Sequence, residues 1–313
     1  MRLYKKNKTA LLPQPLEKGD LLGIIAPAGM LNDEDQFHSG VRILSEMGFE
    51  VKFPRELWPG FDYLSDSDDN RAAELNSFFS DSEVKGIVSM RGGYGCLRIL
   101  DKINLNLISS HPKMLIGFSD ITILQQYLYF TTGLVSLHGP TLSTLADSTK
   151  ETLEKFYASL LGHWKLPVFD KSIVQLQGSG KVTAPLIGGN LASITTLLGT
   201  KYDSDWSDSI VFLEDVNEPI YKVDRMLTQL SASGKFDNVQ GVILGNFTPP
   251  KTKTSLDELR YKESVWKRVL EVCPDNTIPV WGDFPSGHCA HNITFPLGAQ
   301  ATMDCSRCRV TFN

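Results

Sequence analysis

The feature that most constrains the fold is the alternation of two kinds of segment along the first half of the chain. Short apolar runs that end at glycine, proline or a polar residue are typical of buried strands. We expect such strands at 20–29, 50–57, 84–90, 113–118 and 133–140. Segments with apolar residues at helical spacing predict helices at 33–49, 65–81, 95–102, 119–130 and 150–162. This alternation predicts an α/β fold with a largely parallel sheet covered by helices on both faces.

The alternation stops at residues 163–182, which have mixed polarity and no helical period. We therefore expect a first domain at 1–165, a linker at 166–179 and a second domain at 180–313. The second part contains a predicted helix around 256–272 and ends in short strands and turns. This pattern indicates a smaller α+β domain with a curled or barrel-like sheet.

Composition excludes several classes of protein. Among 313 residues the formal net charge is −5, and no basic stripe is visible, so we expect no nucleic-acid partner. No apolar run approaches the roughly 18 residues of a membrane helix, and the basic N-terminal residues lack the apolar run of a signal peptide. Five cysteines favour a reducing compartment. Cys305 and Cys308 are expected in a tight turn between two C-terminal strands, without metal.

Ser119 follows a predicted strand and precedes a predicted helix in the sequence GFSD. It can cap that helix, as can Asp120, or it can be a nucleophile on a strand-to-helix elbow with the Asp120 amide aimed at an oxyanion. The loops at 26–29 and 91–95 end neighbouring strands, so they are expected at the same edge of the sheet. In the second loop, the amide of Gly93 is the candidate second oxyanion donor.

A nucleophilic serine needs a base and a group that orients the base. His138 and His288 both follow strand ends, and each is also readable as an ordinary loop histidine. Glu214 ends an apolar strand, where a buried carboxylate requires a partner. Cys96 at a helix N-terminus is a rival nucleophile, although its position within the helix favours a packing role.

Several motifs in a fixed order resemble the LD-carboxypeptidase family, serine peptidase family S66. They are IIAPAG, RGGYGCLRIL, LIGFSDIT, LHGP, LIGGNL, FLEDVNEPIYKVDRML, GVILGNF and SGHCAHNITFPLG. The resemblance implies a flavodoxin-like N-terminal domain, a C-terminal domain with a barrel-like core and a homodimer. It also implies a Ser–Glu–His triad on Ser119, Glu214 and His288, with the nucleophile and the other two residues in different domains.

The resemblance further implies hydrolysis of the L,D-peptide bond before the terminal D-alanine of a murein tetrapeptide, in cytoplasmic cell-wall recycling. Neither a metal nor an organic cofactor is implied. Arg91 is a candidate for the substrate carboxylate by its position alone. Two alternatives stay open: an S66-type self-immunity hydrolase acting on peptide–nucleotide antibiotics, and an amidotransferase-like enzyme that uses Cys96.

Overall fold

The structure is a computed structural model that describes residues 9–54, 57–165, 168, 171–250, 254–273 and 275–313. The described chain forms two compact units. Of the described residues, the first unit contains those from Thr9 to Trp164 and Ala290–Gly298, and the second contains those in Lys165–Cys289 and in Ala299–Asn313. A short segment late in the chain therefore returns to the first unit. The expected domain boundaries, 1–165 and 180–313, assign this segment to the second domain.

The first unit is built on a six-stranded sheet of order β11-β5-β4-β3-β1-β2. Five strands are parallel in the flavodoxin-like order 2-1-3-4-5, and β11 adds to β5 in the antiparallel direction. The strands are β1 (Leu21–Ile25), β2 (Glu50–Lys52), β3 (Val84–Ser89), β4 (Met114–Gly117), β5 (Ser136–His138) and β11 (Phe295–Leu297). The predicted fold class of this half is confirmed. The predicted second strand is shorter than expected, and residues 55–56 of it lie outside the described residues.

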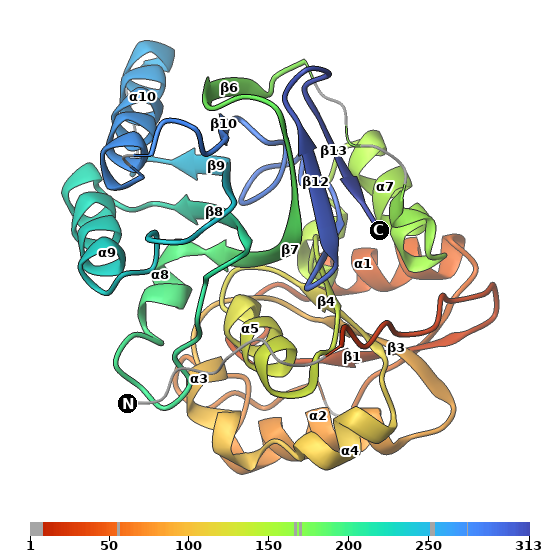
Figure 1. The fold of residues 1–313 in the computed structure, drawn as a ribbon. Coiled ribbons are helices and arrows are strands. Elements are labelled where there is room, and N and C mark those ends of the chain that lie inside the picture. Colours follow the sequence, from red (N-terminus) through yellow and green to blue (C-terminus); the bar gives the residue numbers. More distant parts are fainter. Residues whose placement is uncertain (1–8, 55–56, 166–167, 169–170, 251–253, 274) are drawn as a thin grey trace. The chain divides into compact units, whose positions relative to one another are not determined.

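Helices connect these strands, as Figure 1 shows for α2, α4 and α5 around β3 and β4. All twelve residues of α5 are buried, which fixes this helix firmly against β4 and β5. Side-chain caps begin α1, α2, α4 and α7 at Asp33, Ser67, Asn104 and Thr149. The helices are α1 (Glu34–Glu46), α2 (Asp68–Ser80), α3 (Cys96–Ile99), α4 (Leu105–Ser110), α5 (Ile121–Thr132), α6 (Leu142–Leu145) and α7 (Lys150–Leu160), with 3-10 turns at Leu100–Lys102 and His163–Lys165.

The second unit is built on a mixed seven-stranded sheet of order β13-β12-β7-β8-β9-β10-β6, which curls into a half-barrel. Its strands are β6 (Val174–Gln177), β7 (Lys181–Asn190), β8 (Ile210–Val216), β9 (Gly241–Thr248), β10 (Val280–Gly282), β12 (Gln300–Asp304) and β13 (Arg309–Phe312). Strands β7 to β10 run parallel, whereas β6, β12 and β13 pair antiparallel. Helix α9 (Ile220–Ala232) packs between α8 (Leu191–Thr195) and α10 (Ser255–Val272) (Figure 1).

The stretch expected to be a linker contains strand β6, which pairs with β10 about a hundred residues later in the chain. Four residues of that stretch, 166–167 and 169–170, lie outside the described residues. Cys305 and Cys308 lie in the turn between β12 and β13, as expected, and both are free thiols. In the part of the chain that the structure describes, no group of metal-ligating side chains comes together.

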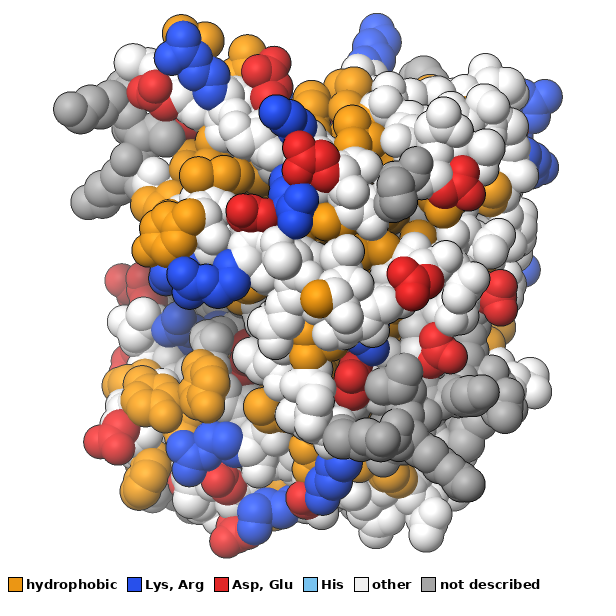
Figure 2. Space-filling model, turned by 60° about the vertical axis from the view of Figure 1, so that its left-hand side comes forward, with side chains coloured by type: hydrophobic (Ala, Val, Ile, Leu, Met, Phe, Trp, Pro, Cys, Tyr) orange, Lys and Arg blue, Asp and Glu red, His pale blue; other side chains and the backbone are white. Residues whose placement is uncertain are grey.

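Charges of both signs are mixed on the surface that Figure 2 shows. On the face drawn in Figure 2, Lys and Arg side chains are interspersed with Asp and Glu side chains. That face has no band of basic side chains of the kind that follows a nucleic-acid backbone. Among the described helices, none is both long and apolar enough to cross a membrane.

Candidate active site

Ser119 lies on the turn that joins β4 to α5, and its backbone is in the left-handed region with φ of +63°. A non-glycine residue rarely adopts this conformation, and it is typical of nucleophile elbows. The helix N-cap is Asp120, and no side-chain hydrogen bond caps α5. The helix-cap interpretation of Ser119 therefore loses its basis, and the half-buried hydroxyl belongs to a strained turn at the carboxyl end of the central strand.

The loop at 91–95 packs directly against this turn. A Cβ added to Gly92 would lie 2.7 Å from Ser119 Cβ and 2.8 Å from Ser119 Oγ, so only glycine allows this approach. Gly93 has φ of +123°, and its Cα lies close to Gly29 of the loop that follows β1. Three loops expected at one edge of the sheet are thus brought together within the first unit.

The two candidate oxyanion donors are the amides of Gly93 and Asp120. Among the described groups, neither amide donates a hydrogen bond to another part of the chain. The Asp120 side chain is turned inward, where its carboxylate accepts a hydrogen bond from the Cys96 amide at 2.9 Å. Backbone amides beside a strained serine are the arrangement that stabilises a developing oxyanion.

Glu214 and His288 come together within the second unit. His288 Nδ1 lies 2.7 Å from Glu214 Oε2. The glutamate is fully buried on β8, while the imidazole is 20 % exposed in the loop after β10. The pairing of β8 with β9 shifts register between Leu213 and Asp215, and a bulge of this kind re-aims the side chains beside it. Both Glu214 and Asp215 consequently point into the interior.

A glycine makes this contact possible. Gly287 has φ of +127°, and a Cβ there would lie 3.0 Å from Glu214 Oε2 and 3.3 Å from Asn246 Cβ. The loop is also held to β9 by two backbone hydrogen bonds, from Phe284 to Leu244 and from Asn246 to Ser286. The main chain that leads to His288 is therefore fixed against β9.

The surroundings of His288 shift its pKa. Burial lowers the pKa of His288, but the charge of Glu214, the hydrogen bond to it and the charge of Asp215 together outweigh burial. The His288 pKa consequently lies above its ordinary value. Burial and the neighbouring Glu214 charge raise the pKa of Asp215 to about 7, even though the amides of Val216 and Ala192 bind its carboxylate. Two adjacent acids thus differ in role: one faces the histidine, and the other anchors the start of α8.

The rival candidates occupy packing positions. His138 is fully buried and stacks on Phe295 with ring centroids 5.0 Å apart. Cys96 is also fully buried, and burial raises its thiol pKa well above the ordinary value. A nucleophilic cysteine requires the opposite shift, so the structure disfavours a Cys96 enzyme. Arg91 is half-buried and donates from Nη1 to the Met30 carbonyl at 3.2 Å.

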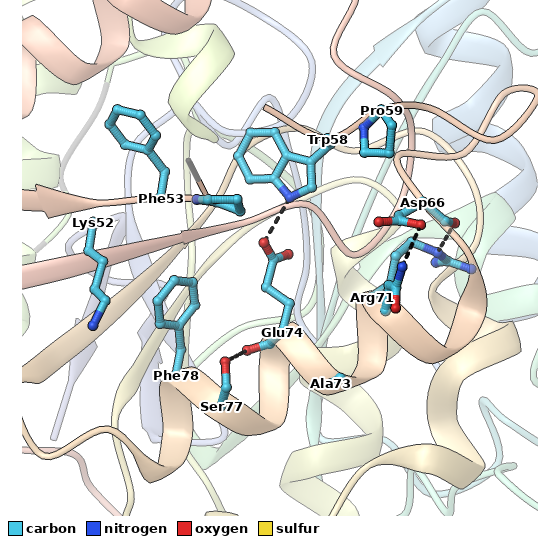
Figure 3. Close-up of a pocket in the computed structure, with 12 residues that line it drawn as sticks. Lys52, Phe53, Trp58, Pro59, Asp66, Arg71, Ala73, Glu74, Ser77 and Phe78 are labelled. Atoms are coloured by element: carbon cyan, nitrogen blue, oxygen red, sulfur yellow. Dashed lines mark hydrogen bonds between the residues drawn. The ribbon is translucent and has the colours of Figure 1, made fainter. Parts of the chain in front are cut away.

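A pocket of about 400 Å³ opens between β2 and α2 in the first unit, lined partly by Phe53, Trp58 and Phe78 (Figure 3). Glu74 points into it and accepts hydrogen bonds from the Trp58 indole at 2.8 Å and from the Ala26 amide at 2.9 Å. Burial raises the Glu74 pKa to about 7. Because both carboxylate oxygens hold the scaffold and no candidate catalytic residue lines the pocket, we assign Glu74 a structural role.

Two further residues belong to the surroundings of Ser119 but did not emerge from the sequence as site residues. Gly92 is the first glycine of RGGYG and contacts the serine. Arg71 is fully buried and binds the carbonyls of Pro27 and Gly95. Arg71 is four residues before Leu75 and seven before Phe78, both of which are buried. This helical spacing indicates that Arg71 lies on the buried face of α2.

Comparison with known proteins agrees with this architecture. Residues 22–139 match the LD-carboxypeptidase N-terminal domain, and residues 183–303 match the LD-carboxypeptidase C-terminal domain. A probable murein peptide carboxypeptidase of Bacillus subtilis is 35% identical over 93% of this chain and 91% of its own length. The murein tetrapeptide carboxypeptidase of Pseudomonas aeruginosa is 30% identical over 92% of this chain and 94% of its own length.

Among solved structures, the MccF-like protein from Bacillus anthracis superposes with a TM-score of 0.85 at 26% identity, covering 97% of this chain and 99% of that one. The fold and these similarities define a hydrolase of the carboxypeptidase class. The chain belongs to the LD-carboxypeptidase family, which confirms the family predicted from its motifs.

Proposed function

We propose that the protein is a serine LD-carboxypeptidase that removes the terminal D-alanine from murein tetrapeptides. The observation that carries the proposal is the 2.7 Å contact between His288 Nδ1 and the buried Glu214. A carboxylate on Nδ1 fixes the tautomer whose Nε2 is basic, as the reaction needs. The names of the murein carboxypeptidases among its relatives support the choice of substrate.

In the proposed reaction, His288 removes the proton from Ser119 Oγ as the oxygen attacks the carbonyl carbon of the scissile bond. The amides of Gly93 and Asp120 stabilise the resulting oxyanion. His288 then donates its proton to the leaving amine of D-alanine, which leaves an acyl-enzyme on Ser119. Water, deprotonated by His288, attacks this ester and releases the shortened peptide. Glu214 balances the imidazolium charge both during acylation of Ser119 and during hydrolysis of the acyl-enzyme.

The test is release of D-alanine from a purified L,D-linked tetrapeptide, with products identified by mass spectrometry. Ser119→Ala is expected to abolish release. Ser110→Ala is the matched control, because the Ser110 hydroxyl binds only carbonyls of its own helix and its neighbouring His111 ring. The same peptide with a terminal L-alanine tests chirality. D-alanine release by Ser119→Ala at the wild-type rate would remove this serine from the mechanism.

Secondary assignments follow from the same proposal. We infer that Arg91 binds the terminal carboxylate of the peptide. We also infer that the protein acts in the cytoplasm and that it forms a homodimer. The likeness to the MccF-like protein and to the microcin C7 self-immunity protein MccF of Escherichia coli supports the second candidate, a self-immunity hydrolase acting on peptide–nucleotide conjugates. Hydrolysis of such a conjugate, with the tetrapeptide left intact, would favour that candidate over murein recycling.

A further inference from the structure

Two side chains hold one peptide unit of the chain that follows Gly93. The Asp120 carboxylate accepts a hydrogen bond from the Cys96 amide at 2.9 Å. Arg71 Nη1 donates to the Gly95 carbonyl at 3.1 Å. The Gly95 carbonyl and the Cys96 amide belong to the same planar peptide group, and they point in opposite directions. This peptide group is therefore held from both sides.

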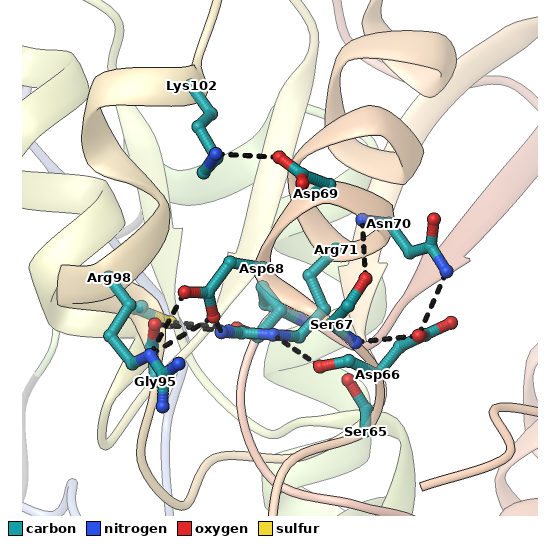
Figure 4. A network of polar contacts seen from close by, with 12 residues as sticks. Ser65, Asp66, Ser67, Asp68, Asp69, Asn70, Arg71, Gly95, Arg98 and Lys102 are labelled. Carbon is teal, nitrogen blue, oxygen red and sulfur yellow. Dashed lines mark hydrogen bonds and ion pairs between the residues drawn. The ribbon is translucent and has the colours of Figure 1, made fainter. Parts of the chain in front are cut away.

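The Arg71 side chain is itself fixed by several contacts. The Arg71 side chain is fully buried, donates to the Asp66 carbonyl at 3.2 Å and pairs with Asp68 at 2.5 Å (Figure 4). It also binds the Pro27 carbonyl in the loop after β1. A planar guanidinium with several simultaneous acceptors has little freedom to move. Arg71 thereby connects the loops that follow β1 and β3.

The position of Gly95 is matched to this arrangement. Gly95 has φ of +131°, and a Cβ there would lie 2.8 Å from Arg71 Nη1 and 2.6 Å from Leu64 Cδ2. At the other end of the loop, the Gly92 carbonyl accepts a hydrogen bond from the Gly29 amide at 3.2 Å. The Gly93 amide belongs to the same peptide group as the Gly92 carbonyl, so this bond holds it directly. The Gly95–Cys96 peptide fixes the other end of the short loop that contains Gly93.

We propose that Arg71 and the Asp120 carboxylate are positioning residues that clamp the Gly95–Cys96 peptide and so aim the Gly93 amide beside Ser119. The inference rests on the proposed function, in which that amide stabilises the oxyanion. Asp120 then serves the reaction twice, through its amide and through its side chain. Substitution of the side chain leaves the amide in place, which separates the two roles.

The catalytic consequence is specific. An oxyanion donor contributes mainly in the transition state, so a misdirected donor lowers kcat and leaves KM nearly unchanged. Loss of a whole donor costs about 10²–10³ in kcat, and we expect a displaced one to cost at least about tenfold. Asp120→Ala and Arg71→Met are both expected to show this pattern. Asp120→Asn keeps an acceptor for the Cys96 amide and is expected to recover most of the rate that Asp120→Ala loses.

A second readout reports the clamp without reference to activity. Hydrogen–deuterium exchange of peptides spanning residues 91–100 is expected to be faster in Asp120→Ala and Arg71→Met, by about tenfold or more at the Cys96 amide. Lys113→Met is the matched control: Lys113 is a buried cation of the same unit that binds the Phe78 and Asp81 carbonyls at the amino end of β4. It is expected to change neither this exchange nor kcat, even where it lowers stability.

The outcomes separate the clamp from the function on which it rests. Faster exchange together with reduced kcat at constant KM supports the inference. Unchanged exchange in Asp120→Ala, or a kcat equal to that of the wild type despite faster exchange, overturns it. A folded wild-type chain that released no D-alanine would defeat the proposed function, whereas the exchange rates would still decide whether Arg71 and Asp120 hold the loop.

Discussion

Gly92 packs so close to Ser119 that a side chain would not fit between them. Gly92→Ala would place a methyl group 2.8 Å from Ser119 Oγ, so either the serine or the loop must move. We expect kcat/KM for the tetrapeptide to fall about 100-fold, since small displacements of reacting groups have effects of this size. Steady-state kinetics measure the change. Gly199→Ala is the control, because its φ of +74° imposes backbone strain in open space, and it should lower stability while kcat is retained.

The buried carboxylate of Glu214 sets the protonation of His288. A general base must be neutral, so activity is expected to fall as the pH drops through the His288 pKa, which the structure places above its ordinary value. Glu214→Gln removes the charge that raises this pKa while desolvation remains. The acidic limb of the kcat/KM profile should therefore move to lower pH, and the plateau should also fall because the imidazolium loses its counter-charge. An acidic limb that stays in place would exclude Glu214 as the group that raises the pKa.

At the residue scale, the sequence indicates which residues are candidates for the site, but not which distant residues they contact. Ser119 and Glu214 each end an apolar strand, which makes them candidates, whereas the choice of His288 over His138 rests on the resemblance to the LD-carboxypeptidase family. The Glu214–His288 contact spans 74 residues, and the Asp120–Cys96 bond spans 24. No local pattern encodes such separations. The left-handed backbone of Ser119 was likewise not visible, because serine has no intrinsic preference for it.

At the scale of elements, a buried ion pair joins the turn that follows α9 to the segment that precedes β8. Lys235 Nζ lies 2.6 Å from Asp203 Oδ1, and the lysine side chain is 3 % exposed. Lys235→Met would leave a buried carboxylate without its cation, so we expect the free energy of unfolding to fall by about 3–5 kcal/mol. Chemical denaturation measures this change.

An exposed pair at the start of α9 provides the comparison. Lys222 and Glu218 lie 3.3 Å apart with the lysine 47 % exposed. Lys222→Met is expected to change the free energy of unfolding by less than about 1 kcal/mol, because solvent screens the pair. Equal effects of the two substitutions would show that burial does not determine how strongly these two ion pairs stabilise the fold.

Most of the helices that the sequence predicts well are long enough to show a clear apolar period. Helices α1, α2, α7 and α10 all appear close to their expected ranges. Helices α6 and α8 have only four and five residues, too few for a helical period to be recognised. Strand β6 has a half-exposed, polar sequence and exists because β10 provides a distant pairing edge. Its formation is a tertiary effect that segment composition does not reveal.

At the scale of the whole molecule, the chain leaves the first unit and later returns to complete it. Residues 290–298 supply β11, which pairs with β5, and the carbonyls of Ala290 and Thr294 accept hydrogen bonds from Thr152 and Ser159 of α7. Folding of the first unit therefore depends on sequence that follows most of the second. The expected contiguous division, 1–165 and 180–313, cannot represent this dependence.

Phe295 is the side chain that fixes the returning segment, since it is fully buried and stacked on His138. Phe295→Ala is expected to lower the free energy of unfolding by about 3–5 kcal/mol, the usual cost of removing a buried aromatic ring. Hydrogen–deuterium exchange should localise the loss of protection to β5 and α7. Phe312→Ala is the reciprocal control, because Phe312 is equally buried on β13 and should expose β12 and β7 instead. If Phe295→Ala loosened the second sheet as strongly as the first, β11 would belong energetically to the unit that surrounds it in sequence.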